Sequence, residues 1–181
     1  MKKLFLLGLV FCLVIASNAQ FTSAGLRANG LTCAMCSNAI NKALLKLPFI
    51  QTVKPDIKNS TFQITFKEGQ DINPDAIKDA VEDAGFSVGR LELSGDLSGD
   101  SVANDKHIRI GGSVYHFLDV GEQVINANTK IVVVDKDFLS LKQYKKISSA
   151  SSMSCVKTGR AGTCCTDAGV AENARVYHVT I

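Results

Sequence analysis

The sequence lacks tryptophan, and only 7% of its 181 residues are aromatic. Aromatic cages and stacking platforms for bases are therefore excluded as its main means of binding. It also lacks a large excess of charge, because its formal net charge is +3 at pH 7. This excludes a strongly basic nucleic-acid-binding protein. Motifs typical of phosphate-binding loops, dinucleotide folds and serine hydrolases are missing too, and no paired carboxylates stand in a setting for acid–base catalysis.

What remains is an ordinary globular composition with an unusual set of cysteines. Hydrophobic residues make up 46% of the chain and charged residues 20%, which excludes wholesale disorder, collagen and coiled coil. The length allows two small domains but no large multidomain enzyme. The six cysteines and three histidines stand out, so they are the candidate functional residues of the chain.

Residues 1–19 have the pattern of a secretory signal peptide. Lys2 and Lys3 form a positively charged start, residues 4–15 are an uncharged apolar run, and Ser17–Ala19 supplies small residues for cleavage. The apolar run is shorter than the about 20 residues that a membrane-spanning helix needs. We therefore expect cleavage after Ala19, and a secreted or periplasmic protein without a membrane span. Loss of the two lysines would bring its net charge to about +1.

The apolar pattern of residues 23–95 changes period in the order β-α-β-β-α-β. Alternation typical of strands occurs around residues 24–28, 53–57, 62–66 and 86–93, and helical stripes occur over 40–47 and 77–84. Asn73 is suited to cap the second helix, Pro74 to begin it and Gly85 to end it. Pro55 predicts that the second strand lies at a sheet edge. The order predicts an α+β, ferredoxin-like domain with two helices over a four-stranded sheet.

Two cysteines lie where the first strand gives way to the first helix, in the stretch Gly30-Leu31-Thr32-Cys33-Ala34-Met35-Cys36. Two thiols three residues apart at a helix start can converge on one soft ion, and the positive helix end favours their thiolate forms. Two thiolates in a near-linear arrangement satisfy Cu(I), whereas Zn²⁺ usually takes four ligands. The spacing therefore predicts a Cu(I) site with Cys33 and Cys36 as ligands.

This stretch resembles the G-M-x-C-x-x-C motif of the heavy-metal-associated domain, which occurs in copper chaperones, metal-transporting ATPases and periplasmic mercury-binding proteins. Leu31 replaces the usual methionine of the motif. The resemblance covers residues 23–95 only, and its further matches are Leu44, Leu47 and Pro48 in the L-x-x-L-P stretch and Ala84, Gly85 and Phe86 at the A-G-[YF] corner.

The resemblance implies a metal ion as ligand and a metal-transporting or metal-accepting protein as partner. It also implies that Gly30 and Leu31 support the loop and that Phe86 shields it without binding the metal. Zinc-selective members usually carry aspartate beside the first cysteine, so Thr32 at that place favours copper. We expect a non-enzymatic metallochaperone or metal-sequestering protein that passes Cu(I) on by thiol exchange.

Two other functions use the same ligand chemistry. A C-x-x-C pair also serves thiol–disulfide oxidoreductases, although a thioredoxin normally has an aromatic residue before its first cysteine, where this chain has Thr32. Other soft or divalent ions, namely mercury, cadmium and zinc, also bind thiolates. A mercury or cadmium scavenger is therefore a further interpretation.

The second half of the chain has a different pattern. Residues 96–103 are polar, contain glycine and have no periodicity, which predicts a linker. Residues 104–181 are expected to form a small mostly-β domain, with a helix within 138–147 and strands at 107–110, 114–120, 131–134 and 175–181. Three strands, a helix and a last strand would fit a partly open barrel of the oligonucleotide/oligosaccharide-binding type.

The remaining cysteines, Cys155, Cys164 and Cys165, permit two interpretations. A disulfide from Cys155 to Cys164 or Cys165 would stabilise the fold by about 2–3 kcal/mol. Alternatively the three thiols, with Met153 or His178, form a second soft-metal site that exchanges ions with the first. Removal of the signal peptide leaves an odd number of cysteines, so at least one is free, metal-bound or paired with another molecule.

The three histidines are isolated from one another in the sequence. His107, His116 and His178 each lie in a strand-like segment, and we expect them to pack at the surface or half-buried rather than to bind metal. His178 is the strongest exception, because a terminal strand could bring it near the cysteines.

Overall fold

The computed structural model describes residues 20–181 except 32, 98 and 128. The predicted signal peptide and Thr32 lie outside the described residues. The first half contains strands β1 (Gln20–Asn29), β2 (Ile50–Asp56), β3 (Thr61–Phe66) and β4 (Ser87–Asp96) and helices α1 (Ala34–Leu44) and α2 (Pro74–Asp83). These follow the predicted β-α-β-β-α-β order. None of the helices in the described part of the chain is long and apolar enough to cross a membrane.

The four strands of the first half form an antiparallel sheet in the order β2-β3-β1-β4. β2 lies at the sheet edge, as its proline predicts. Asn73 caps α2 by accepting a hydrogen bond from the Ala76 amide at 3.1 Å, and Pro74 begins the helix. The apolar stripes of both helices are buried, including Ile40 and Leu44 of α1 and Ile77, Ala80 and Val81 of α2.

A β-bulge explains why the alternation of apolar residues slips within β4. Arg27 of β1 pairs with Arg90, but the next residue, Ala28, pairs with Val88, so Gly89 is an extra residue on β4. Val88 and Leu91 are three residues apart and are both buried. A Cβ atom at Gly89 would lie only 2.5 Å from Asn29 Oδ1, so a larger residue there would require the Asn29 side chain to shift.

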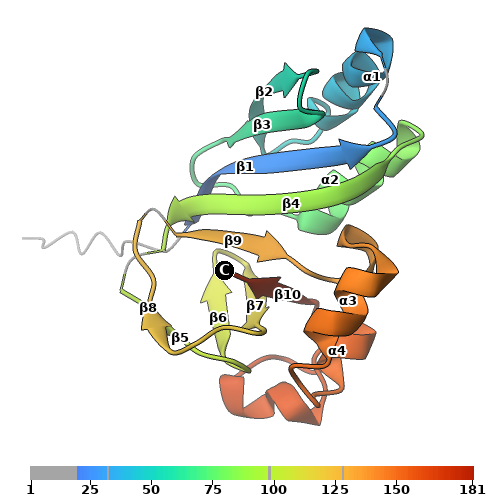
Figure 1. The fold of residues 1–181 in the computed structure, drawn as a ribbon. Helices are drawn as coiled ribbons and strands as arrows, with labels where there is room; N and C mark the ends of the chain where they lie inside the picture. The colour runs from blue at the N-terminus through green and yellow to red at the C-terminus, as the bar shows by residue number, and fades with distance from the viewer. Residues whose placement is uncertain (1–19, 32, 98, 128) are drawn as a thin grey trace, which may run out of the picture.

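The second half extends the same sheet. Its strands in this sheet are β6 (His107–Ile110), β7 (Ser113–Phe117), β9 (Lys130–Val133) and β10 (Val176–Thr180), each of which overlaps one of the four predicted segments. The eight-stranded sheet has the order β2-β3-β1-β4-β9-β10-β7-β6 (Figure 1). β9 pairs antiparallel with β4, and β10 pairs antiparallel with β9 but parallel with β7.

Two expectations about this half are wrong. Residues 96–103 do not separate two bodies, because β4 extends to Asp96, the side chains of Leu97 and Val102 are buried, and β5 (Ser101–Val102) pairs with β8 (Gln123–Val124). The strands also do not form a separate barrel of the oligonucleotide-binding type. They add to the edge of the first sheet, and no pairing among the described strands joins β2 to β6.

The sheet of the second half is buried on both faces. On one face, Val133, Tyr177 and Val179 join the apolar core under α1 and α2. The opposite face packs against α4 (Cys155–Thr158) and the 3₁₀ helix η2 (Thr163–Ala168) through Val114, Val132 and Val176. α3 (Leu141–Ser148), preceded by the 3₁₀ helix η1 (Lys136–Phe138), overlaps the predicted helical region 138–147, and a capping box at Ser140 stabilises its start.

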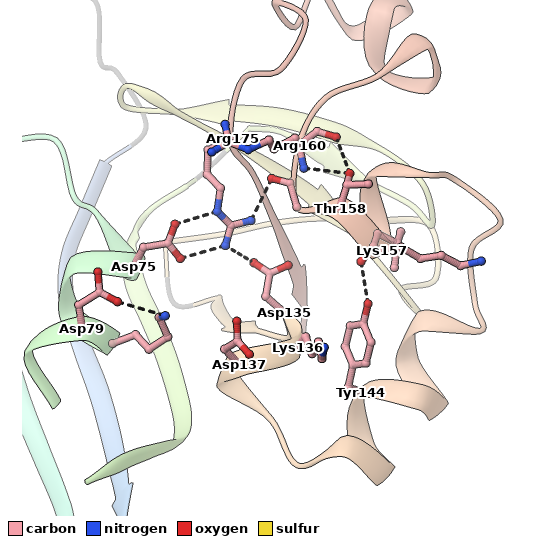
Figure 2. A pocket seen from close by; sticks show the side chains of 13 residues that line it. Asp75, Asp79, Asp135, Lys136, Asp137, Tyr144, Lys157, Thr158, Arg160 and Arg175 are labelled. Carbon is pink, nitrogen blue, oxygen red and sulfur yellow. Dashed lines mark hydrogen bonds and ion pairs between the residues drawn. The ribbon is translucent and has the colours of Figure 1, made fainter. Parts of the chain in front are cut away.

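Arg175 joins the two halves across a polar pocket of about 410 Å³ (Figure 2). Its guanidinium donates two hydrogen bonds to Asp75 in the first turn of α2, at 2.8 and 3.0 Å, and one to Asp135 after β9, at 2.9 Å. Burial alone would raise the pKa of Asp75, but Arg175 outweighs it and holds that pKa below the ordinary value of 3.8. The ion pairs therefore fix α2 against the added strands.

Replacing Arg175 by methionine should lower the free energy of unfolding. Breaking a fully buried ion pair costs about 3–5 kcal/mol. Because the Arg175 side chain is 28% exposed, we expect a loss of about 2 kcal/mol. Urea denaturation followed by circular dichroism would measure it.

Arg160→Met is the matched control, because Arg160 lines the same pocket but is exposed and donates to a backbone carbonyl, that of Asn173. It should change stability by less than about 0.5 kcal/mol. Acidification below pH 4 should destabilise the wild type, because the unfolded chain takes up the Asp75 proton before the folded chain does. This dependence of stability on acid should be weaker in Arg175→Met than in the wild type. If Arg175→Met and Arg160→Met lost the same free energy of unfolding, the structural role given to the Arg175 ion pairs would be contradicted.

Candidate metal centre

Cys33 and Cys36 lie together at the start of α1. Cys33 is the N-cap residue with extended backbone, and Cys36 lies in the first turn, with 5.4 Å between their Cα atoms. The two are joined by a disulfide bond, and the Cys36 amide donates a hydrogen bond to Cys33 Sγ at 3.2 Å. Cys33 is exposed and Cys36 is partly buried. Both sulfurs are therefore close to solvent.

The helix start supplies favourable electrostatics for these sulfurs. α1 has eleven residues and no acidic residue in its first turn. Its free amides and positive dipole end therefore face the pair without a competing carboxylate. After reduction, this environment favours thiolates, which are the metal-binding form of cysteine.

The residues predicted to support the loop lie beside it. Gly30 has φ +81°, a backbone conformation that glycine adopts without strain, and its Cα faces Phe86, whose Cδ1 would be 3.8 Å from an added Cβ. Leu31 and Phe86 are partly buried against the main apolar core. The Phe86 ring is thus placed to hold the loop from the α2 side, and its shielding role stays a prediction.

A second group of thiols lies under the added strands. Cys155 begins α4, Cys164 and Cys165 belong to η2, and all three are free. Their Sγ atoms lie within 4.8 Å of one another, with 3.5 Å between Cys164 and Cys165. The disulfide considered from the sequence is not formed, but the predicted convergence of the three residues is present.

The three thiols differ in environment. Cys155 and Cys165 are fully buried, whereas Cys164 is only partly buried. Burial raises the pKa of Cys155 and of Cys165. A hydrogen bond from the Ser154 hydroxyl, whose oxygen is 3.4 Å from Cys164 Sγ, lowers the pKa of Cys164 to about 6. The partly exposed thiol is therefore the one that ionises most readily.

The histidines are not isolated in the fold, which corrects the expectation that they are separate packing residues. His107 pairs with His116 across β6 and β7, and His116 pairs with His178 across β7 and β10. The ring centroids of the first pair are 4.1 Å apart and those of the second pair are 5.2 Å apart. Three imidazoles thus lie side by side on the face covered by α4.

Each buried imidazole is oriented by a carboxylate. His116 Nε2 is 3.1 Å from Asp105 Oδ1, and His178 Nδ1 is 2.6 Å from Asp135 Oδ1. The other nitrogen of His116, Nδ1, lies 3.5 Å from Cys155 Sγ. Burial, together with the neighbouring imidazoles, lowers the pKa of His116 to about 4, so its ring is neutral at pH 7.

Sequence reasoning missed this cluster because the parallel pairing of β10 with β7 joins distant segments. The available signal was the repeated dipeptide Tyr-His, at Tyr115-His116 and at Tyr177-His178, which the register aligns residue by residue. Figure 1 also shows that α1 and α4 lie at opposite ends of the molecule. Direct exchange of ions between the two thiol groups of one chain, which the sequence had led us to consider, is not supported by this arrangement.

Known proteins resemble the first half of the chain. Residues 26–87 match the family of the heavy-metal-associated domain. The chain is 31% identical over 83 residues to a protein of Arabidopsis thaliana named probable copper-transporting ATPase HMA5, and 29% identical over 59 residues to the copper chaperone CopZ of Staphylococcus haemolyticus (strain JCSC1435). These alignments cover 46% and 33% of this chain.

The same alignments cover very different shares of the relatives' own lengths, namely 8% of the ATPase and 85% of the chaperone. The superposition on a solved structure of a CopZ metallochaperone covers 37% of this chain and 98% of the metallochaperone chain. The sequence identity is 22% and the TM-score is 0.35. The family match leaves residues 88–181 outside it. The added strands and their cysteines therefore have to be interpreted from their own geometry.

The burial of the thiols predicts an order of alkylation. After reduction of the Cys33–Cys36 disulfide, iodoacetamide should modify Cys33 first and Cys155 and Cys165 last, because the reagent must reach the sulfur. We expect rates that differ by at least about tenfold, measured by mass spectrometry of tryptic peptides. In denaturant the rates should become similar. Equal labelling of Cys155 and Cys33 in the native protein would contradict the buried position of Cys155.

Proposed function

Because residues 26–87 form a heavy-metal-associated domain, we propose that the chain binds Cu(I) through the reduced Cys33–Cys36 pair and passes it to a partner protein. The observation that carries this proposal is the position of both sulfurs at the start of α1, close to solvent. The two curated relatives are named as copper proteins, which supports copper as the metal.

The ligand set supports a low-coordinate ion. Among the described residues, no histidine or carboxylate joins Cys33 and Cys36 in a group of three metal-ligating side chains. Zn²⁺ would therefore lack two of its usual four ligands, whereas two thiolates satisfy Cu(I). Mercury and cadmium share the preference for thiolate, so the metal carried in the cell is decided by supply as well as by the site.

Transfer follows from the exposure of the site. A thiolate of the partner forms a third bond to Cu(I), after which one of the bonds to Cys33 or Cys36 breaks. The copper stays monovalent throughout, and a proton from the incoming thiol is returned to the released cysteine through solvent. Because Cys33 is exposed, a partner sulfur can approach without movement of the fold. We therefore propose metal delivery to a metal-accepting or metal-transporting protein rather than catalysis.

The disulfide between Cys33 and Cys36 favours a second candidate function, thiol–disulfide exchange. In that function the pair would accept two electrons from a dithiol substrate and become two thiols. For copper binding, the same reduction is a preparatory step, in which an external thiol reductant supplies the two electrons. Oxidation of a model dithiol peptide by the disulfide form, or reduction of insulin by an external thiol reductant through the dithiol form, at a rate clearly above the uncatalysed one, would favour the oxidoreductase and weigh against the metallochaperone.

We also propose that residues 1–19 direct export of the chain. The support is the order of lysines, apolar run and small residues in that segment. N-terminal sequencing of the protein recovered from the producing cells should then begin at Gln20. A mature protein that still begins with Met1 would exclude cleaved export.

Replacing both Cys33 and Cys36 by serine should abolish one tight equivalent of Cu(I). Serine oxygen is a poor ligand for a soft ion, so the remaining loop cannot hold Cu(I) against a chelator. The measurement is anaerobic titration of the fully reduced full-length chain with Cu(I) in the presence of a competing chromophoric chelator. Binding unchanged by this double substitution would refute the proposed site.

The matched control changes the two exposed residues between the cysteines, Ala34 and Met35, to serine and leucine. This Ala34→Ser, Met35→Leu variant keeps both thiols, so it should bind as many equivalents as the wild type. Loss of an equivalent in the control would assign the binding to the methionine rather than to the thiol pair.

A further inference from the structure

We propose that Cys155, Cys164 and Cys165 form a second, separate binding site for a soft monovalent metal ion of the Cu(I) class. The site lies in the part of the chain outside the family match. It has its own ligands and lies at the opposite end of the molecule from α1 (Figure 1). It can therefore be tested independently of the Cys33–Cys36 pair.

The spacing of the three sulfurs suits one metal ion. Metal–thiolate bonds are about 2.3 Å long, so three sulfurs in a trigonal arrangement around one ion are about 4 Å apart. The three Sγ atoms lie within 4.8 Å of one another, and Cys164 and Cys165 are 3.5 Å apart. Shifts of a few tenths of an ångström in side-chain position would bring all three to bonding distance.

The imidazoles behind Cys155 supply a second observation that points to a ligand. His107, His116 and Cys155 each place a ligand atom within 4.8 Å of the others. Nε2 of His107 is buried and has no hydrogen-bond partner among the described residues. Buried polar atoms are rarely left unpaired, so an unpartnered imidazole nitrogen in this histidine–cysteine group is consistent with a site that takes up a ligand.

Asp105 prepares His116 to assist this site. The carboxylate accepts a hydrogen bond from Nε2–H of His116, which leaves the lone pair of Nδ1 facing Cys155 Sγ at 3.5 Å. The Cys155 thiol can donate its proton to that lone pair. A bound metal ion would displace this proton to solvent and leave Cys155 as a thiolate ligand. His116 is thus a positioning residue, while the three sulfurs are the ligands.

The surroundings of the site indicate retention rather than rapid transfer. Cys155 and Cys165 belong to the apolar cluster that includes Val114, Val132 and Val176. Only Cys164 is partly exposed, so an ion would enter and leave at that sulfur. A partner thiol can reach one of the three ligands but not the other two. We therefore expect slower exchange of Cu(I) here than at the exposed Cys33–Cys36 pair.

The test uses the reduced full-length chain and Cu(I) as the probe, under anaerobic conditions with a chelator in competition. The wild type should bind two equivalents, and Cys33→Ser, Cys36→Ser should bind one, with a sulfur-to-copper charge-transfer band in the ultraviolet. Cys155→Ser, Cys164→Ser, Cys165→Ser should also bind one. Each site is thereby assigned to its own cysteines.

The outcomes separate this inference from the proposed function. If the wild type binds one equivalent and Cys33→Ser, Cys36→Ser binds none, the second site is refuted and the function proposed for the first pair stands. If Cys33→Ser, Cys36→Ser still binds one equivalent and the wild type binds no more than one, the second site stands and the proposed function fails.

A single substitution tests the second site even if the triple variant does not fold. Cys164→Ser changes the partly exposed sulfur, so it should keep the wild-type unfolding curve while weakening Cu(I) binding at the second site by at least tenfold. Thr163→Ser, the neighbouring exposed residue, should change neither property. Equal Cu(I) affinity in Cys164→Ser and wild type would overturn the three-sulfur assignment, as would preferential Zn²⁺ binding that disappears in His116→Gln.

Discussion

The pairing of β4 with β9 is the constraint on which the rest of the architecture depends. In a free-standing sheet of order β2-β3-β1-β4, β4 would be an edge with unpaired amides and carbonyls. Here Leu91 pairs with Val133 and Leu93 with Ile131, so backbone hydrogen bonds and burial of apolar side chains act at the same edge. Once β9 is fixed, β10 and β7 extend the sheet beyond α2, and their free face has to be covered. The helices that carry the three cysteines cover it.

Asp135 links this added sheet to both the junction and the histidines. One of its carboxylate oxygens accepts a hydrogen bond from Arg175, and the other lies against His178. A buried carboxylate without such partners would be strongly destabilising. The contacts with Arg175 and His178 together therefore allow Asp135 to be buried. Tyr177, between Arg175 and His178 in sequence, faces the other side of β10 and donates to Asn73 at the start of α2. The last strand therefore holds α2 on one face and the imidazole cluster on the other.

The first half could be predicted from the sequence because its determinants are local. Asn73 and Pro74 mark the start of α2, and the positions of Cys33 and Cys36 relative to the first helix follow from spacing alone. The slip between Val88 and Leu91 was visible, but its cause, the bulge at Gly89, depends on the register with β1. In the second half the strands were recognisable one by one, but their partners were not, because β10 pairs in parallel with a strand about sixty residues away. The histidine cluster follows from that pairing and could not be obtained without it.

Burial decides what each thiol group can do with a metal ion. Exchange between thiolates requires that an incoming sulfur reach the ion before a bound one leaves, so it depends on open space beside the site. Cys33 has that space at the surface of α1, which is consistent with delivery. Cys155 and Cys165 are instead surrounded by apolar side chains that leave no open space for an incoming sulfur. A metal ion held there could leave only by way of Cys164. The same chemistry would then give a labile site at one end of the sheet and a retentive one at the other. Because the retentive site is built from helices that also cover the sheet, a bound ion there would stabilise the added strands, whereas an ion at the exposed loop would add little to the fold.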